Sequence, residues 1–239
     1  MDSLPPAQIR FDQPGIADLT LADGSEGRAA VDVLRHGVAQ AVNRGAVTVR
    51  WWAAPATATT DRTALDAGLE PTRDLLHLRV PLPASDPDPA VVTRPFTRAD
   101  AEAWIDVNNR AFHWHPEQSG MTVPRLEAIM AESWFDADGF LLHESDGRLA
   151  GFCWTKLHHD QDPLLGEIFV IAVDPDFHGR GLGLQLTLAG LHWLHRAGAV
   201  VGGLYVEADN TPAIAAYERI GFTLHHVQRA YTHTTGATP

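Results

Sequence analysis

Three glycines crowd the junction between an apolar segment and a leucine-rich segment, and this junction constrains the fold more than any other part of the chain. Gly179, Gly181 and Gly183 lie in "DFHGRGLG", after the strand-like run "GEIFVIAV" and before the helix-like run "LGLQLTLAGLHWLHRAG". Glycine allows positive φ angles and close approach of another group to the backbone. A strand, a glycine loop and a helix N-terminus together predict either a tight turn or a set of backbone N–H groups that bind an anion such as pyrophosphate.

Two well-known phosphate loops are excluded by the residues that follow the glycines. A Walker loop ends in Gly-Lys-Ser/Thr, and a Rossmann loop would carry another glycine in place of Gln185. Neither pattern is present. The loop therefore favours another kind of anion site.

The composition is that of an ordinary globular protein, with 45% apolar and 20% charged residues in 239. The 18 basic and 30 acidic side chains give a formal net charge of −12, which argues against nucleic acid or an anionic membrane as the main partner. No apolar run reaches the roughly 18 to 20 residues of a membrane span, and "MDSLPPAQIRFDQPG" lacks the features of a secretory signal. Because the only cysteine, Cys153, cannot form an internal disulfide, a cytoplasmic location is expected.

The proline- and aspartate-rich stretch "PLPASDPDPAVV" predicts a linker at residues 84–90 between an N-terminal segment, 1–83, and a larger domain, 91–239. The N-terminal segment is predicted to contain a helix, a strand, a helix and a strand after a loose N-terminal end. The larger domain reads as β-α-α-β-β-β-α-β-α-β, which requires a mixed sheet in an α/β fold. Its strand "GEIFVIAV" is apolar enough to be buried on both faces.

Two segments of the larger domain resemble the acetyl-CoA core of the GNAT N-acetyltransferases. They are "VIAVDPDFHGRGLG" and "LYVEADNTPAIAAYERIGF". The family's loop is Q/R-x-x-G-x-G/A, and Gly181 and Gly183 match its glycines, whereas His178 stands where Gln or Arg is usual. The resemblance implies the GNAT fold and acetyl-CoA as co-substrate.

A closer likeness covers most of residues 91–239. The stretches "NRAFHWHPEQSG", "WFDADGFLLHESDGRLAGFCWTK" and "GEIFVIAVDP" are similar to the mycothiol synthase family. Those enzymes have two tandem GNAT-like domains and acetylate the cysteinyl amine of Cys-GlcN-Ins with the second domain. Because "WWAAPATATTDRTALDAGLEPTRDLLHLRVPLP" is similar to the end of the first domain, residues 1–83 are expected to be a truncated, partial GNAT-like half-domain.

This resemblance implies the roles of individual residues. Glu167 matches the general base, and Tyr217 matches the acid that protonates the departing CoA thiolate. Glu117, Lys156, Tyr205 and Glu167 itself match positions that contact the amine substrate. The implied acetyl-CoA contacts are Ile171, Ala172 and Val173 on the strand, His178, Gly179, Arg180, Gly181, Leu182, Gly183 and Leu184 in the loop, and Asn210, Thr211, Pro212, Ala213, Ile214 and Ala215 on the next helix.

Each polar or aromatic candidate has a simpler structural interpretation. Glu167 and Lys156 could be charges at strand ends, Glu117 a loop charge, and Tyr205 and Tyr217 aromatic residues packed on the sheet. Cys153 has no identifiable histidine partner, so an inert buried thiol is expected.

No metal site is expected, because "LHHDQD" and the pair His192 and His195 are not completed by a Cys/His framework. The expected partner is a small-molecule amine, and the chain is expected to be a monomer or a homodimer. Two rival functions remain open. One is a GNAT acetyltransferase for another small amine or a peptide N-terminus, and the other is a catalytically weak acetyl-CoA-binding paralogue.

Overall fold

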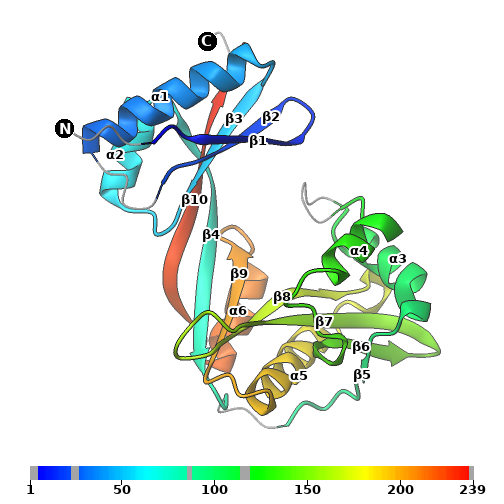
Figure 1. The fold of residues 1–239 in the computed structure, drawn as a ribbon. Coiled ribbons are helices and arrows are strands. Elements are labelled where there is room, and N and C mark those ends of the chain that lie inside the picture. The colour runs from blue at the N-terminus through cyan, green and yellow to red at the C-terminus, as the bar shows by residue number, and fades with distance from the viewer. Residues whose placement is uncertain (1–4, 23–26, 85–87, 114–118, 237–239) are drawn as a thin grey trace. The chain divides into compact units, whose positions relative to one another are not determined.

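The computed structural model describes residues 5–22, 27–84, 88–113 and 119–236, which form two compact units (Figure 1). The first unit comprises Met1–His77, Val206–Asp209 and Leu224–Pro239, and the second comprises Leu78–Tyr205 and Asn210–Thr223. These units are defined by contacts in space. They do not test the predicted division of the chain at residues 84–90, which stays a prediction.

The first unit is a sheet with two helices. Its elements are β1 (Gln8–Gln13), β2 (Ile16–Thr20), α1 (Gly27–Asn43), β3 (Thr48–Ala53), α2 (Ala58–Asp66) and parts of β4 (Glu70–Pro81) and β10 (Thr223–Thr234). Strand β3 runs parallel to β2 and antiparallel to β10. The last strand of the chain therefore extends the sheet that the N-terminal segment begins.

The described part of the N-terminal end, residues 5–22, is not loose, and that prediction is wrong. Strands β1 and β2 form an antiparallel hairpin, which turns at Gly15 with a φ of +74°. Ala17 and Leu19 of β2 are buried in one core with Leu34 of α1 and Trp51 of β3. The hairpin was missed because its alternating apolar residues are few and gain their burial only from contact with α1.

The second unit is a mixed sheet between helices. Its elements are β5 (Arg94–Pro95), α3 (Ala101–Ala111), α4 (Val123–Met130), β6 (Phe140–Ser145), β7 (Arg148–His158), β8 (Leu165–Val173), α5 (Leu182–Arg196), β9 (Val201–Glu207, which ends in the first unit) and α6 (Thr211–Ile220), with the 3₁₀ turns η1 (Arg98–Asp100), η2 (Ala137–Gly139) and η3 (Pro175–Phe177). The strand order is β9-β8-β7-β6-β5, antiparallel except for the parallel pair of β8 and β9. The expected α/β mixed sheet is confirmed.

Helices α3 and α5 both pack on β7 and β8, on opposite faces, as neighbouring residues of β7 show. Trp154 stacks on Phe140 with ring centroids 4.2 Å apart and meets Trp104 of α3 edge to face at 5.7 Å. Cys153 lies against Gly190 of α5, where an added Cβ would come within 2.4 Å of the sulfur. Successive strand side chains point to opposite faces, so the sheet is covered on both sides.

Strand β8 corrects another expectation, since it is not buried on both faces. Leu165, Gly166, Ile168, Val170 and Ala172 are buried, whereas the residues between them on the other face are only partly covered. The register with β7 shifts between Trp154 and Thr155. The partly open face carries Glu167, Phe169, Ile171 and Val173, and three of these, Glu167, Ile171 and Val173, are predicted site residues.

In the described part of the chain, no helix combines the length and apolar character needed to cross a lipid bilayer.

Candidate active site

The glycine loop is an open turn that leads into helix α5. Gly179 and Gly181 have φ angles of +76° and +74°, which other residues rarely adopt. Gly181 is the N-cap of α5, where no described side chain caps the first turn by a hydrogen bond. A Cβ added at Gly179, Gly181 or Gly183 would meet no described atom within 4 Å. The backbone N–H groups of this helix N-terminus are thus accessible to an anion.

Gly183 differs from the other two glycines. It is the second residue of α5 and has no positive φ angle. Neither its backbone conformation nor packing against the protein requires glycine. The missing side chain leaves room above the first turn of the helix, which is the space that a phosphate would use.

Ion pairs and a hydrogen bond fix the segment between β8 and the loop. Buried Asp174 lies 3.0 Å from Nη1 of Arg110, and Asp176 lies 3.0 Å from Nη2 of the same guanidinium. Arg148 holds Asp176 at 2.9 Å. The ring of His178 donates from Nε2 to the carbonyl oxygen of Val173 at 3.0 Å. His178, the departure from the family's loop pattern, therefore folds the loop back onto the end of β8.

A cavity of about 610 Å³ joins β8, the glycine loop, α5 and α6. Twelve of the sixteen predicted acetyl-CoA contacts line it: Ile171, Ala172, Val173, His178, Gly179, Gly181, Leu182, Gly183, Leu184, Asn210, Pro212 and Ala213. Arg180, Thr211, Ile214 and Ala215 are not among the lining residues. The guanidinium of Arg180 instead lies over the ring of Phe177, 4.9 Å from its centroid.

The wall of this cavity also includes residues that sequence reasoning missed. They are Phe177, Thr187, Ala216 and Arg219. Thr187 and Ala216 lie one helical turn beyond predicted residues, so helical spacing could have identified them. Arg219 adds a positive charge on α6, but no sequence signal separates it from an ordinary surface arginine.

Strand β8 leaves its neighbour β9 as it approaches the cavity. The parallel register joins Leu165 to Val201 and ends with Ile168 and Leu204. Ile171 to Val173 lie beyond that register, on the cavity wall. A diverging strand presents main-chain N–H and C=O groups to which an extended ligand can add.

Glu167 projects from the partly open face of β8 and is held by a histidine. Its Oε2 lies 2.6 Å from Nε2 of His158, and the two side chains are only 13% and 19% exposed. Lys156 stands opposite Glu167 in the β7 register, with its Nζ 4.7 Å from the centre of the Trp134 ring. His158 was not predicted, although its position two residues after Lys156 on the same strand places both on one face.

Tyr205 lies near Glu167 from the end of β9. Desolvation, and then the negative charge of Glu167, raise the pKa of the Tyr205 phenol above its ordinary value. Its side chain is 38% exposed, so Tyr205 is not a core aromatic residue. One cluster of polar side chains therefore contains Glu167, His158 and Tyr205.

Tyr217 of α6 lines the cavity beside the loop. Burial, with a smaller contribution from Cys153, raises the pKa of the Tyr217 phenol to about 12. Its ring meets Phe222 edge to face at 5.7 Å. The phenol is therefore fully protonated at neutral pH and can act only as a hydrogen donor to a developing anion.

Two other candidates have different outcomes. The expected burial of Cys153 is confirmed, and this burial raises the pKa of its thiol to about 12, which favours the neutral, unreactive form at physiological pH. Glu117 lies outside the described residues, and its role in binding the amine stays a prediction.

The family model described as the acetyltransferase (GNAT) family matches residues 102–222. Among solved structures, a GCN5-related N-acetyltransferase from Sphaerobacter thermophilus superposes with a TM-score of 0.76 over 95% of this chain and 76% of that one, at 20% identity. A tandem GNAT protein from the clavulanic acid biosynthesis pathway gives a TM-score of 0.66 over 94% and 77%, at 17% identity. The fold and its loop are those of the GNAT acetyltransferase class.

Curated relatives show which family within the GNAT class this chain is similar to. A mycothiol acetyltransferase of Catenulispora acidiphila is 44% identical over 205 residues, which cover 82% of this chain and 64% of the relative. Those of Nocardia farcinica and Rhodococcus jostii are 39% and 38% identical and cover 92% and 93% of this chain and 75% of each relative. The chain belongs to the mycothiol acetyltransferase family of GNAT proteins, and it spans less than two thirds of the first relative's length. The expected family and fold are confirmed.

Proposed function

We propose that the protein transfers the acetyl group of acetyl-CoA to the cysteinyl amine of Cys-GlcN-Ins and so forms mycothiol. Family membership supports the acetyltransferase activity and the substrate. The main structural support for this reaction is one cavity, whose wall contains the open glycine loop at the start of α5, Tyr217 and the diverging end of β8.

The proposed co-substrate site uses the features of this cavity. The pyrophosphate binds the N–H groups of the loop and of the first turn of α5, where the helix dipole adds a favourable potential. Arg219 on the cavity wall contributes positive charge. The pantetheine arm lies along Ile171 to Val173 and adds to the edge of β8 beyond its register with β9.

In the proposed reaction, the amine nitrogen attacks the thioester carbonyl carbon directly, within a complex of both substrates. Glu167, held by His158 at 2.6 Å, takes the amine proton directly or through a water molecule. An α-amino group has an ordinary pKa of about 8, so a carboxylate is a sufficient base. The C–N bond forms, the C–S bond breaks, and CoA leaves as its thiolate.

The raised pKa of Tyr217 refines its proposed role. A thiol has an ordinary pKa of about 8.5, whereas the Tyr217 phenol has a pKa of about 12. Complete proton transfer from this phenol to a thiolate is therefore unfavourable. Tyr217 instead stabilises the departing thiolate by donating a hydrogen bond, and the thiolate gains its proton from solvent.

The amine substrate is proposed to lie on the open face of β7 and β8. Lys156 and Tyr205, near Glu167, offer hydrogen-bond donors to the hydroxyl groups of the sugar and inositol. Glu117 is proposed as a third contact because of its position in the family pattern. No metal ion takes part in this scheme.

The test is thiol release from acetyl-CoA by the purified protein with Cys-GlcN-Ins, in the wild type and in Glu167→Gln. We expect turnover that falls by about 10²-fold or more in the variant, because a general base is lost. Glu218→Gln, an exposed glutamate of α6, is the matched control and keeps wild-type activity. Acetyl-CoA binding is measured in all three proteins and is expected to be equal.

The other outcomes have distinct meanings. Acetylation of a different small amine or of a peptide N-terminus, without acetylation of Cys-GlcN-Ins, would overturn the substrate and leave the enzyme class. Binding of acetyl-CoA without turnover on any amine would overturn the enzymatic function and indicate a binding paralogue.

A further inference from the structure

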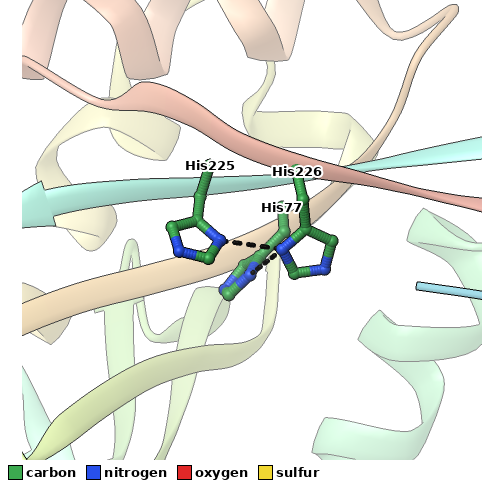
Figure 2. A group of neighbouring side chains, drawn as sticks. All are labelled: His77, His225 and His226. Atoms are coloured by element: carbon green, nitrogen blue, oxygen red, sulfur yellow. Dashed lines mark hydrogen bonds between the residues drawn. The ribbon is translucent and has the colours of Figure 1, made fainter. Parts of the chain in front are cut away.

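Three histidines of the first unit meet although they are far apart in the sequence. His77 lies on β4, and His225 and His226 lie on β10 (Figure 2). One ring nitrogen from each lies within 4.8 Å of the others. All three residues lie outside the part of the chain that the GNAT family model matches, residues 102–222.

The ring nitrogens lie close enough together to approach one shared ion. Nδ1 of His226 lies 2.8 Å from Nδ1 of His225 and 3.4 Å from Nδ1 of His77. A tetrahedral Zn²⁺ with Zn–N bonds of about 2.0–2.1 Å separates its nitrogen ligands by about 3.3 Å. These two nitrogen separations lie on either side of this value, and the ring nitrogens of the third pair, His77 and His225, lie within 4.8 Å, so the rings must rotate to bring all three nitrogens to bonding distance of one ion.

The facing nitrogens are better satisfied by a cation than by one another. A neutral imidazole has one N–H, and each ring nitrogen has a single in-plane direction for a hydrogen or a lone pair. Nδ1 of His226 faces both other Nδ1 atoms in Figure 2, and one hydrogen or one lone pair cannot serve both well. A metal ion between the rings accepts a lone pair from all three.

The ring of His77 is held by packing before any ion binds. His77 is only 2% exposed, and its ring packs edge to face on His226 and His225, with centroids 4.7 and 5.4 Å apart. His225 is exposed, so an ion reaches the group from solvent. Three protein ligands leave a fourth position, which water can fill on that side.

We propose that His77, His225 and His226 bind one divalent transition-metal ion, with Zn²⁺ as the preferred occupant. A site of imidazoles alone suits Zn²⁺, Co²⁺, Ni²⁺ or Cu²⁺ and disfavours Mg²⁺ and Ca²⁺, which require oxygen ligands. Tetrahedral coordination by three nitrogens and one water is typical of zinc. The ion cross-links β4 to β10, which are distant in sequence, and so stabilises the first unit.

The primary experiment titrates tag-free, chelator-treated protein of full length with Zn²⁺, using a competing chromophoric chelator and isothermal calorimetry. We expect one ion per chain. Co²⁺ is the second probe, because tetrahedral Co²⁺ absorbs visible light far more strongly than the aqueous ion. Zn²⁺ is also expected to raise the midpoint of thermal unfolding with increasing concentration, since it binds the folded protein.

The informative variant is His225→Gln, because this side chain is exposed and its loss leaves the core intact. We expect the affinity for Zn²⁺ to fall by about tenfold or more and the visible Co²⁺ band to disappear. His226→Gln should behave in the same way. His36→Gln removes another exposed histidine of the first unit, which lies on α1 and is not a member of the group, and should bind Zn²⁺ as the wild type does.

Two results would overturn the site. One is a wild type that binds less than one Zn²⁺ per chain or gives no tetrahedral Co²⁺ spectrum. The other is unchanged affinity in both His225→Gln and His226→Gln, with circular dichroism showing that the variants are folded. Neither readout depends on acetyl transfer, so failure of this site and failure of the proposed reaction are separate findings.

Discussion

At the scale of single residues, the contact between Glu167 and His158 defines the proposed base. A carboxylate at a strand position can rotate, and a base acts well only when it stays near the proton that it takes. The Nε2 atom of His158, 2.6 Å from the carboxylate, restricts that rotation. His158 is thus a positioning residue rather than a catalytic one.

We predict that His158→Gln lowers kcat by roughly tenfold to a hundredfold, because a hydrogen bond to a charged group contributes about 1.5–3 kcal/mol. The KM for acetyl-CoA should not change. His159→Gln, at the exposed neighbouring position, is the control. Combined with Glu167→Gln, the substitution should cost little further activity, since both act through one carboxylate. Fully additive losses would show that His158 acts independently of Glu167.

The raised pKa of Tyr217 makes a second prediction at this scale. Its phenol, with a pKa of about 12, stays protonated as pH rises, so kcat of the wild type should show no loss from this group up to about pH 10. Tyr217→Phe should lower kcat by about 10²-fold at every pH in that range, since only the hydrogen-bond donor is removed. Tyr205→Phe is expected to change the KM for the amine rather than kcat. A kcat profile with an apparent pKa of 8–9 that Tyr217→Phe abolishes would contradict this role.

At the scale of elements, the N-terminus of α5 combines two kinds of glycine. Gly181 needs glycine for its φ of +74°. Gly183 is helical, and its missing side chain faces open space. The two positions therefore separate folding from ligand binding.

We predict that Gly183→Ala leaves the protein equally stable or more stable by roughly 0.5–1 kcal/mol, because alanine is the better helix former. It should raise the KM for acetyl-CoA by about tenfold or more, since the new methyl group occupies the phosphate space. Gly181→Ala should instead lower stability by about 1–2 kcal/mol through its left-handed backbone. Urea unfolding and acetyl-CoA titration measure the two effects. Unchanged acetyl-CoA affinity in Gly183→Ala would place the phosphates elsewhere.

At the scale of the whole molecule, paired carboxylates in both units set the stability at acid pH. A hydrogen bond from Tyr231 is the largest cause of the lowered pKa of Asp61 in the first unit. In the second unit, the ion pair with Arg94 at 2.7 Å lowers the pKa of Asp100 to about 2. Since both pKa values are depressed, this stability is present above about pH 4 and is lost as the pH falls through the folded-state values.

We predict that Asp100→Asn lowers the free energy of unfolding by on the order of 2 kcal/mol at pH 7, and that its difference from the wild type shrinks as the pH falls from 4 to 2. Chemical denaturation over this pH range measures both quantities. Glu102→Gln, an exposed neighbour on α3, should leave the curve unchanged. A difference that is as large at pH 2 as at pH 7 would mean that Asp100 acts through packing rather than charge.

Local signals predicted much of the second unit. The turn at Asp146 and Gly147 has the positive φ angles that its residues favour, and α4 begins with Thr122 as its N-cap and Pro124 in its first turn, which are typical residues for these positions. The glycine loop could also be predicted, because a conformation with positive φ depends on a few consecutive residues. The burial of β8 could not be predicted, since apolar composition does not reveal which face of a strand a neighbouring helix covers.

By itself, the sequence determined the α/β class, the glycine loop and Glu167, Tyr205 and Tyr217 as candidates, because these depend on short patterns and on family resemblance. Only the tertiary structure brought His158 to Glu167 and paired β10 with β3. It also joined His77 to His225 and His226, 148 and 149 positions away along the chain. Such contacts depend on which strands lie side by side, and no periodicity within one strand specifies its partner.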